Sequence, residues 1–341
     1  MSAKVGRRED WQGEHVLVTG GAGFIGSHLA SALAEVGARV TVLDDLSTGD
    51  IENLLPSLAD GQVRLLRGSI LDNRALVRAF RDVGHVFHLA ATVGVQRVLE
   101  RPLEAIHVNV HGTQRVLAQA SKCGARTLIA SSSEVYGPQS GPLKESLPLV
   151  MGPTDTIRWS YGCAKALSEY EAFEHHRRFG LPVTVARFFN VIGPRQTGRY
   201  GMVVPRFVSA ALRGDPLHVV GDGSQTRSFC DVRDTVEAIL RLAESEESIG
   251  QVCNVGSDDE ISIATLAERI VAWTGSASPI VPVPPETVYP GGFADIERRC
   301  PSLDRLEALT GFRPAISLEE SIRHIAAGIA SRGELEEGAS G

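Results

Sequence analysis

Gly20-Gly21-Ala22-Gly23-Phe24-Ile25-Gly26 directly follows the apolar run His15–Thr19 and opens a segment with helical periodicity, Phe24–Val36. A strand–turn–helix unit of this kind presents free backbone N–H groups at the start of its helix, where they bind the pyrophosphate of a dinucleotide. Glycine serves the tight turn, the close approach of backbone to phosphate, and the packing of the helix on the strand. The stretch therefore predicts a dinucleotide-binding fold.

An acidic residue, Asp44, follows the next apolar run, Arg39–Leu43. A carboxylate at this place accepts hydrogen bonds from the adenosine ribose hydroxyls and repels the 2′-phosphate of NADP. A glycine cluster alone would also fit an ordinary strand–helix turn. The strand, the helix and Asp44 together favour NAD.

Strand and helix patterns alternate through the first half of the chain. Further strands are expected at Val63–Leu66, Val86–Leu89, Thr127–Ala130 and Leu181–Phe188, and helices at Asn73–Arg81 and Leu103–Lys122. Strands separated by helices predict an α/β fold with a Rossmann-type, doubly wound parallel sheet covered on both faces.

The character of the chain changes after Asn190, where Gly and Pro become more frequent. Loops are expected at Gly193–Gly201, Gly221–Gln225 and Pro282–Gly292, and helices at Ile263–Trp273 and Leu318–Ala330. We expect an NAD-binding domain over residues 13–190 and a smaller substrate-binding lobe mainly over 191–330, with some return to the sheet. The ligand cleft should lie between them, and residues 331–341 should form a disordered tail.

The composition excludes several classes of protein. A net charge of −7 over 341 residues argues against nucleic acid or an anionic membrane as the main partner. The five cysteines are scattered without CxxC spacing, and the histidines show no metal-ligand spacing, so we expect no disulfide framework and no metal site. No apolar signal-peptide core and no run of transmembrane length occurs, so a cytoplasmic location is expected.

Tyr161 and Lys165 lie four residues apart in the segment Tyr161-Gly162-Cys163-Ala164-Lys165, so a helix places them on one face. A protonated lysine and a positively charged nicotinamide would both lower the pKa of the tyrosine, and a phenolate is a competent base for a sugar hydroxyl. Ser131-Ser132-Ser133 follows an expected strand at the carboxyl edge of the sheet, where a hydroxyl can orient the substrate.

The chain resembles the extended short-chain dehydrogenase/reductases, specifically the NAD-dependent nucleotide-sugar epimerases, dehydratases and decarboxylases. The resemblance runs from about His15 to about Ile322. Besides the glycine and tyrosine motifs, it is carried by His88-Leu89-Ala90-Ala91, Asn109-Val110-His111-Gly112-Thr113, the SSSEVYG segment from Ser131 to Gly137, and Arg187-Phe188-Phe189-Asn190.

The resemblance implies a catalytic triad of Ser132, Tyr161 and Lys165, with Glu134 beside it. It implies NAD contacts from the following residues: Gly20, Gly23, Phe24, Ile25, Gly26, Asp44, Asp45, Leu46, Ser47, Thr48, Ser69, Ile70, Leu89, Ala90, Ala91, Asn109, Tyr161 and Lys165. It implies contacts with a UDP-sugar from Val95, Gln96, Arg97, Ser132, Ser133, Asn190, Arg195, Val204, His218, Val220, Arg227 and Arg299. It also implies a homodimer formed by the helices near Leu103–Lys122 and Tyr161–Phe179.

Three arginines are candidates for binding the anionic groups of a ligand. Arg227 matches the pyrophosphate arginine of the family, Arg299 falls where decarboxylases place a cleft-facing arginine, and Arg195 is our candidate for a substrate carboxylate. Each of them could instead be a solvated surface arginine. The strand Leu217–Val220 should pair with uracil through its backbone, flanked by His218 and Val220, although His218 would also fit as an ordinary surface histidine.

Particular positions bear on the reaction. Ser133 stands where the 4,6-dehydratases carry an aspartic acid, which disfavours dehydration, whereas Glu134 is retained as in the UDP-glucuronate decarboxylases. Glu134 could also serve only to support its loop. The stretch from Ala90 to Pro102 is similar to UDP-glucuronate 4-epimerases, but Gln96 replaces their arginine and Asn190 replaces a threonine.

These features favour a UDP-sugar 4-epimerase acting on UDP-glucuronate and UDP-galacturonate through a 4-keto sugar. UDP-glucuronate decarboxylase comes next, followed by an epimerase for UDP-glucose or UDP-N-acetylglucosamine. A non-catalytic NAD-binding relative is the alternative from another class, but such proteins usually lose the tyrosine or the lysine.

Overall fold

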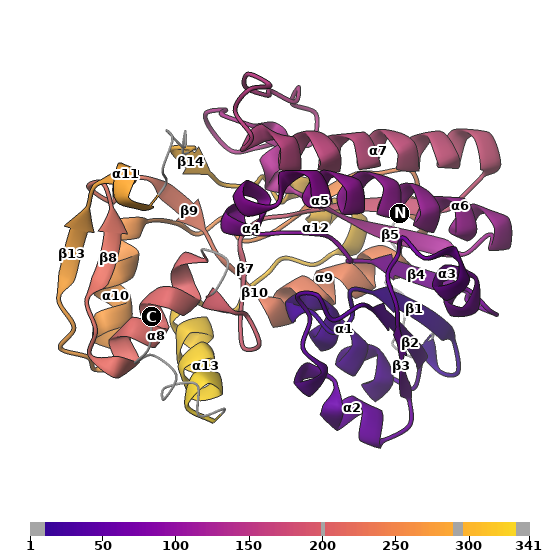
Figure 1. The fold of residues 1–341 in the computed structure, drawn as a ribbon, viewed down its shortest axis with the longest axis horizontal. Helices are drawn as coiled ribbons and strands as arrows, with labels where there is room; N and C mark the ends of the chain where they lie inside the picture. Colours follow the sequence, from indigo (N-terminus) through magenta and orange to yellow (C-terminus); the bar gives the residue numbers. More distant parts are fainter. Residues whose placement is uncertain (1–10, 199–201, 289–295, 332–341) are drawn as a thin grey trace.

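A seven-stranded parallel sheet forms the centre of the molecule (Figure 1). The computed structural model describes residues 11–198, 202–288 and 296–331. In spatial order the strands are β11 (Val252–Val255), β6 (Val183–Phe188), β5 (Arg126–Ser132), β4 (His85–His88), β1 (His15–Thr19), β2 (Arg39–Asp44) and β3 (Val63–Arg67). The chain runs outward from β1 to β3 and then returns to place β4 on the other side of β1. This reversal opens a crevice at the carboxyl ends of the strands, as in other doubly wound sheets.

Helices cover both faces of the sheet because its central strands are buried on both sides. On one face lie α3 (Asn73–Ala79), α6 (Thr113–Cys123) and α7 (Trp159–Phe179), and on the other lie α1 (Phe24–Glu35), α9 (Val232–Glu244) and α12 (Asp304–Thr310). Each layer has its own apolar core. This is the Rossmann-type fold that the sequence predicts.

A smaller lobe lies beside the sheet, at the left of Figure 1. Three helices, α8 (Val203–Arg213), α10 (Ile263–Thr274) and α13 (Leu318–Ser331), pack around a separate apolar core. Its strands are the parallel pair β8 (Leu217–Val220) and β13 (Ile280–Val283), and the sheet β12 (Glu260–Ser262), β9 (Thr226–Ser228) and β14 (Arg298–Arg299). A short pair, β7 (Val191–Ile192) and β10 (Cys230–Asp231), joins the lobe to the sheet. The remaining helices are α2 (Leu55–Ala59), α4 (Val95–Glu100), α5 (Pro102–His107) and α11 (Pro285–Val288).

Two expected elements differ from the structure. The helix expected at Leu103–Lys122 is α5 and α6 joined through a π-helical turn, Val108–Gly112, because a single wide turn does not disturb the 3.6-residue pattern over the whole segment. The expected loop Pro282–Gly292 begins inside β13 and includes α11, and its last residues, 289–292, lie outside the described residues.

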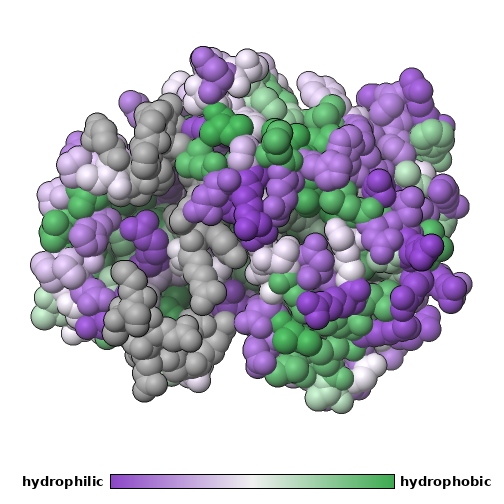
Figure 2. Space-filling view, in the orientation of Figure 1, coloured by the Kyte–Doolittle hydropathy of each residue, from purple (hydrophilic) through white to green (hydrophobic). Residues whose placement is uncertain are grey.

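The second half of the chain does not stay in the lobe. The elements α9, β11 and α12 return to the sheet, whereas α13 closes the lobe at Ser331. The expected tail beyond Ser331 lies outside the described residues. Within the described ranges, no helix has both the length and the apolar character needed to cross a membrane. On the face in Figure 2, hydrophilic side chains predominate, and hydrophobic atoms gather at the lower right, near α2, where Ile51 and Leu55 are exposed.

Candidate active site

A cavity of about 1250 Å³ separates the carboxyl edge of the sheet from the lobe. The glycine turn and the end of β2 line one end of it, and α8, β8, β9 and β14 line the other. The end of β5 and the start of α7 lie between these two ends. The site therefore forms at the switch point of the sheet, which is where such folds bind ligands.

The glycine turn fits a bound pyrophosphate. Gly20 has φ +72°, and a Cβ there would lie 2.7 Å from the backbone of Ala90. A Cβ at Gly26 would lie 2.2 Å from the carbonyl oxygen of Gly20, so a side chain at Gly26 would push the helix off the turn. Gly23 precedes α1 without any side-chain cap. The first N–H groups of α1 are thus left available for a phosphate ligand.

Asp44 organises the ribose end of the cleft. Its carboxylate accepts hydrogen bonds from Ala22 N at 2.9 Å and Leu46 N at 2.8 Å, which connects the glycine turn to the loop after β2. Burial raises the pKa of Asp44, and these two N–H groups oppose that rise. Both oxygens keep further acceptor capacity, which suits ribose hydroxyls.

Tyr161, Lys165 and Ser132 come together where α7 crosses the end of β5. Lys165 is buried, and its Nζ donates to Ala130 O at 2.8 Å and lies 6.0 Å from the centre of the Tyr161 ring. Burial lowers the pKa of Lys165 to about 8, while the Glu169 carboxylate raises it. Ser132 Oγ accepts from Glu134 N at 3.2 Å, which caps the short 3₁₀ helix Ser133–Tyr136.

The protein groups around Tyr161 by themselves raise the pKa of its phenol. Burial raises the pKa of its phenol above the ordinary value, the Glu134 charge adds to the rise, and a hydrogen bond with Ser132 opposes it. The protein alone therefore does not favour the phenolate. A lowered pKa needs a cation closer to the ring than Lys165.

Glu134 lies between two guanidinium groups from opposite walls of the cleft. Arg299 Nη1 approaches its Oε1 at 2.8 Å, and Arg158 Nη2 approaches its Oε2 at 3.5 Å. Burial by itself would raise the pKa of Glu134, but Arg299, Arg158 and, more weakly, Arg227 outweigh burial and lower it. Glu134 is therefore held as a carboxylate.

Charge is unevenly distributed along the cleft. Asp44, Asp45 and Asp50 line the ribose end. Among the described residues, the arginines that line the other end are Arg158, Arg195, Arg206, Arg213, Arg227 and Arg299. The acidic end repels a 2′-phosphate, and the basic end attracts a diphosphate, although the whole chain is acidic.

Nearly all the residues predicted to bind cofactor or substrate line this cleft, with three groups of exceptions. Asn109 is buried and does not line the cleft; its carboxamide pairs with the N–H and the C=O of Thr92, which does. Arg97 does not line the cleft itself, but its guanidinium donates to Ser47 O and to Glu104, which do line it. Val95 and Gln96 lie on α4, but their side chains lie outside the described part of the structure.

Three of the arginines that line the cleft were not identified from the sequence: Arg158, Arg206 and Arg213. Arg158 precedes Tyr161 by three residues and belongs to none of the recognised motifs, so only its contact with Glu134 reveals it. Arg206 lines the cleft from α8, in a segment where only Val204 was singled out. The local sequence pattern does not predict that Arg206 lies near the edge strand β8.

Arg195 does not join the cluster around Glu134. It has φ +69° and lines both the cleft and a separate depression between α1 and α9. Burial lowers the pKa of His28 in that depression to about 4, and the Arg195 charge contributes to the lowering. The charge of Arg195 thus influences a residue of α1, His28, as well as the cleft.

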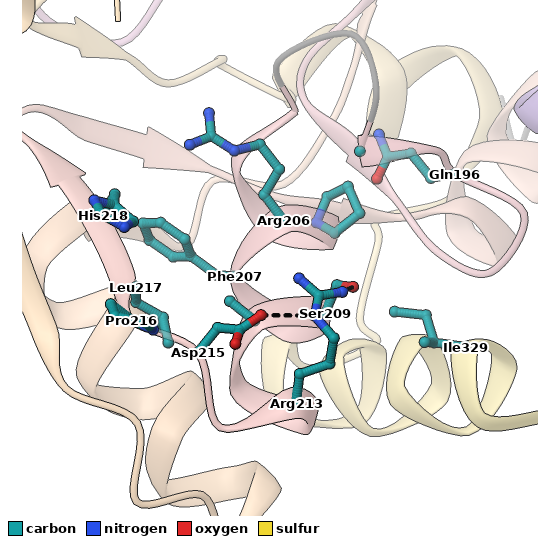
Figure 3. A pocket seen from close by; sticks show the side chains of 13 residues that line it. Gln196, Arg206, Phe207, Ser209, Arg213, Asp215, Pro216, Leu217, His218 and Ile329 are labelled. Atoms are coloured by element: carbon teal, nitrogen blue, oxygen red, sulfur yellow. Dashed lines mark hydrogen bonds and ion pairs between the residues drawn. The ribbon is translucent and has the colours of Figure 1, made fainter. Parts of the chain in front are cut away.

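Figure 3 shows a second pocket, of about 470 Å³, between α8, β8 and α13. Its residues Arg206, Phe207 and His218 also line the main cleft. Arg213 is already bound to Asp215 at 2.7 Å and to Ser209 at 2.6 Å. His218, which belongs to β8, therefore lies on the common border of the two cavities.

Comparison with known proteins identifies the family. The model of the NAD dependent epimerase/dehydratase family matches residues 16–256. The chain belongs to this family. A UDP-N-acetyl-alpha-D-glucosaminuronate decarboxylase of Bacillus cytotoxicus is 42% identical over 308 residues, covering 90% of this chain and 95% of the relative. UDP-glucuronic acid decarboxylase 6 of Arabidopsis thaliana is 35% identical over 309 residues, covering 90% and 86%.

A solved structure of UDP-glucuronic acid 4-epimerase from Bacillus cereus, in complex with UDP-glucuronic acid and NAD, superposes with a TM-score of 0.84. It is 25% identical and covers 93% of this chain and 99% of that one. Membership of the epimerase/dehydratase family makes NAD the cofactor, in agreement with the uncapped α1 and the acidic ribose end. The identities favour the decarboxylase alternative over the 4-epimerase that the sequence analysis placed first.

Proposed function

We propose that this protein is an NAD-dependent decarboxylase of a UDP-linked uronic acid, either UDP-glucuronate or its 2-acetamido counterpart. The observation that carries the proposal is Glu134, held between Arg299 and Arg158 next to Tyr161. The two decarboxylase relatives support it. The similarity of residues 90–102 to UDP-glucuronate 4-epimerases, together with the solved 4-epimerase, keeps 4-epimerisation as the second candidate.

The residues at the end of β5 and on α7 serve proton transfer at the sugar. Tyr161 takes the proton of the 4-hydroxyl, and Ser132 orients that hydroxyl. Bound NAD supplies reversible hydride removal at C4, which makes the uronate a β-keto acid. Lys165 and the positive nicotinamide both favour the Tyr161 phenolate, opposing the burial that raises the pKa of this tyrosine.

The cluster around Glu134 serves the carboxylate at C6. A β-keto acid loses carbon dioxide when its carboxylate turns out of the plane of the ketone, and C5 then takes up a proton. Arg299 can bind that carboxylate, because it lines the cleft and carries a positive charge beside Glu134. The charge of Glu134 disfavours a second carboxylate nearby, and loss of neutral carbon dioxide relieves this repulsion.

The test is incubation of the purified protein with UDP-glucuronate and, separately, with UDP-N-acetylglucosaminuronate. We expect release of carbon dioxide and formation of the UDP-pentose, which mass spectrometry detects by its lower mass. The more reactive sugar identifies the substrate. Formation of an isomer of unchanged mass, without carbon dioxide, would make the protein an epimerase and overturn the proposal.

Glu134→Gln is the matched variant, since it keeps the shape of the side chain and removes its charge. Release of carbon dioxide should fall by about two to four orders of magnitude, the scale on which a positioned ionisable group contributes. The bound NAD should remain.

A further inference from the structure

Arg158 is a buried cation at the N-cap of α7, directly before the helix begins at Trp159. Its side chain is 4% exposed, and its guanidinium lies 5.1 Å from the centre of the Trp159 ring. A guanidinium so far removed from water costs free energy unless anions or aromatic faces compensate for the lost hydration. Trp159 provides one such partner, and the carboxylate of Glu134 provides the anion.

The two arginines hold Glu134 from different parts of the molecule. Arg299 belongs to β14 in the lobe and approaches Oε1, whereas Arg158 is the N-cap residue of α7 and approaches Oε2. A carboxylate bound at both oxygens cannot rotate about its terminal bond without losing one contact. Arg158 directly precedes the helix that carries Tyr161, so the position of Glu134 is coupled to that of Tyr161.

We propose that Arg158 is a positioning residue, which holds Glu134 ionised and in one orientation between α7 and the lobe. Arg299 faces the substrate, whereas Arg158 acts through Glu134. The part of the inference that concerns carbon dioxide release rests on the proposed function; the part that concerns the charge of Glu134 does not.

The charges that face Glu134 determine in which direction its pKa should move when Arg158 is removed. They are Arg158 from the N-cap of α7, Arg299 from β14 and Arg227 from β9, with the neutral phenol of Tyr161 beside them. Burial raises the pKa of Glu134, and the three cations lower it. Removal of Arg158 therefore raises this pKa, so that Glu134 becomes protonated at a higher pH than in the unaltered protein.

The direct test is a pH titration of Glu134 by carbon-13 NMR in NAD-loaded protein labelled at the glutamate carboxyl carbons. The signal is assigned by its loss in Glu134→Gln. Arg158→Gln should raise the pKa of Glu134 by about one unit or more, the usual effect of an opposite charge within 4–6 Å. In Arg158→Lys the pKa of Glu134 should stay close to its value in the unaltered protein, because lysine keeps the positive charge.

Arg177→Gln is the matched control. It removes an exposed cation of α7, and this cation pairs with Glu174 and not with Glu134. It should leave the titration of Glu134 unchanged. Kinetics supply a second measurement: in Arg158→Gln the acidic limb of the rate of carbon dioxide release should move to higher pH by the same amount, whereas KM for the UDP-sugar should change less than about twofold.

An unchanged titration of Glu134 in Arg158→Gln would overturn the inference, as would a failure of Arg158→Lys to restore it. A dominant rise in KM would show that Arg158 binds the sugar instead. If the unaltered protein forms only a C4 epimer, the proposed function fails, and the NMR titration still decides the role of Arg158.

Discussion

Lys165 Nζ donates to the carbonyl oxygen of Ala130 at 2.8 Å, and this hydrogen bond joins α7 to the carboxyl end of β5. It fixes the register at which Tyr161 meets Ser132. One turn further along the helix, the carboxylate of Glu169 accepts from Ser131 and from Arg187 on β6. Contacts at successive turns thus place the catalytic face of α7 on the sheet.

Tyr161→Phe should lower turnover by about two to four orders of magnitude, because it removes the acid–base group without changing the ring. NAD should stay bound, since the glycine turn and Asp44 are untouched. Steady-state kinetics and the absorbance of released cofactor measure both effects. A variant with more than about a tenth of normal activity would identify another group as the base.

Arg299→Lys should weaken catalysis with a UDP-uronate by roughly ten- to a hundredfold, because a charge-assisted, bidentate contact is worth about 1.5–3 kcal/mol. Arg195→Ala is the comparison, since Arg195 was the sequence-based candidate for the carboxylate. We expect Arg299→Lys to lose more activity than Arg195→Ala. Residual turnover of UDP-glucose, which has no C6 carboxylate, should change little in either variant. A greater loss of activity in Arg195→Ala would show that Arg195 binds the carboxylate.

Gly26→Ala should yield protein that retains little NAD, because the added Cβ would lie 2.2 Å from Gly20 O and displace the turn. Overpacking of this kind destabilises a fold by about 1–3 kcal/mol. Gly124→Ala provides the control: Gly124 has φ +66° and open space around it, so its cost is conformational alone. Thermal unfolding and NAD content should show that both variants lose stability and that Gly26→Ala alone loses cofactor.

The homodimer remains a prediction, and α5 and α7 carry apolar side chains that suit it. Leu103 is 81% exposed, and Tyr170 and Phe179 are each 64% exposed. Light scattering at micromolar concentration should give twice the mass of the chain. Tyr170→Glu should shift the equilibrium toward monomer, and a monomer in the unaltered protein would exclude this assembly.

Local sequence determined most of the fold and the cofactor end of the site. The glycine turn, Asp44 and the Tyr161–Lys165 spacing depend on contacts within one strand–helix–strand unit or one helix face, so their period and order can be read from the chain. The π-helical turn at Val108–Gly112 and the strand β13 were missed, because the first disturbs the helical period too little and the second forms only by pairing with β8.

Tertiary structure decided the chemistry around Glu134. Its partners come from α7 and from β14, which is 165 residues further along the chain, and no local pattern relates Glu134 to Arg299 or Arg158. The same holds for the hydrogen bonds of Asn109 with Thr92 and of Arg97 with Ser47 O, since only the folded chain brings these partners together. Sequence determines which residues can carry charge; the packing of the lobe against the sheet determines which charges face one another.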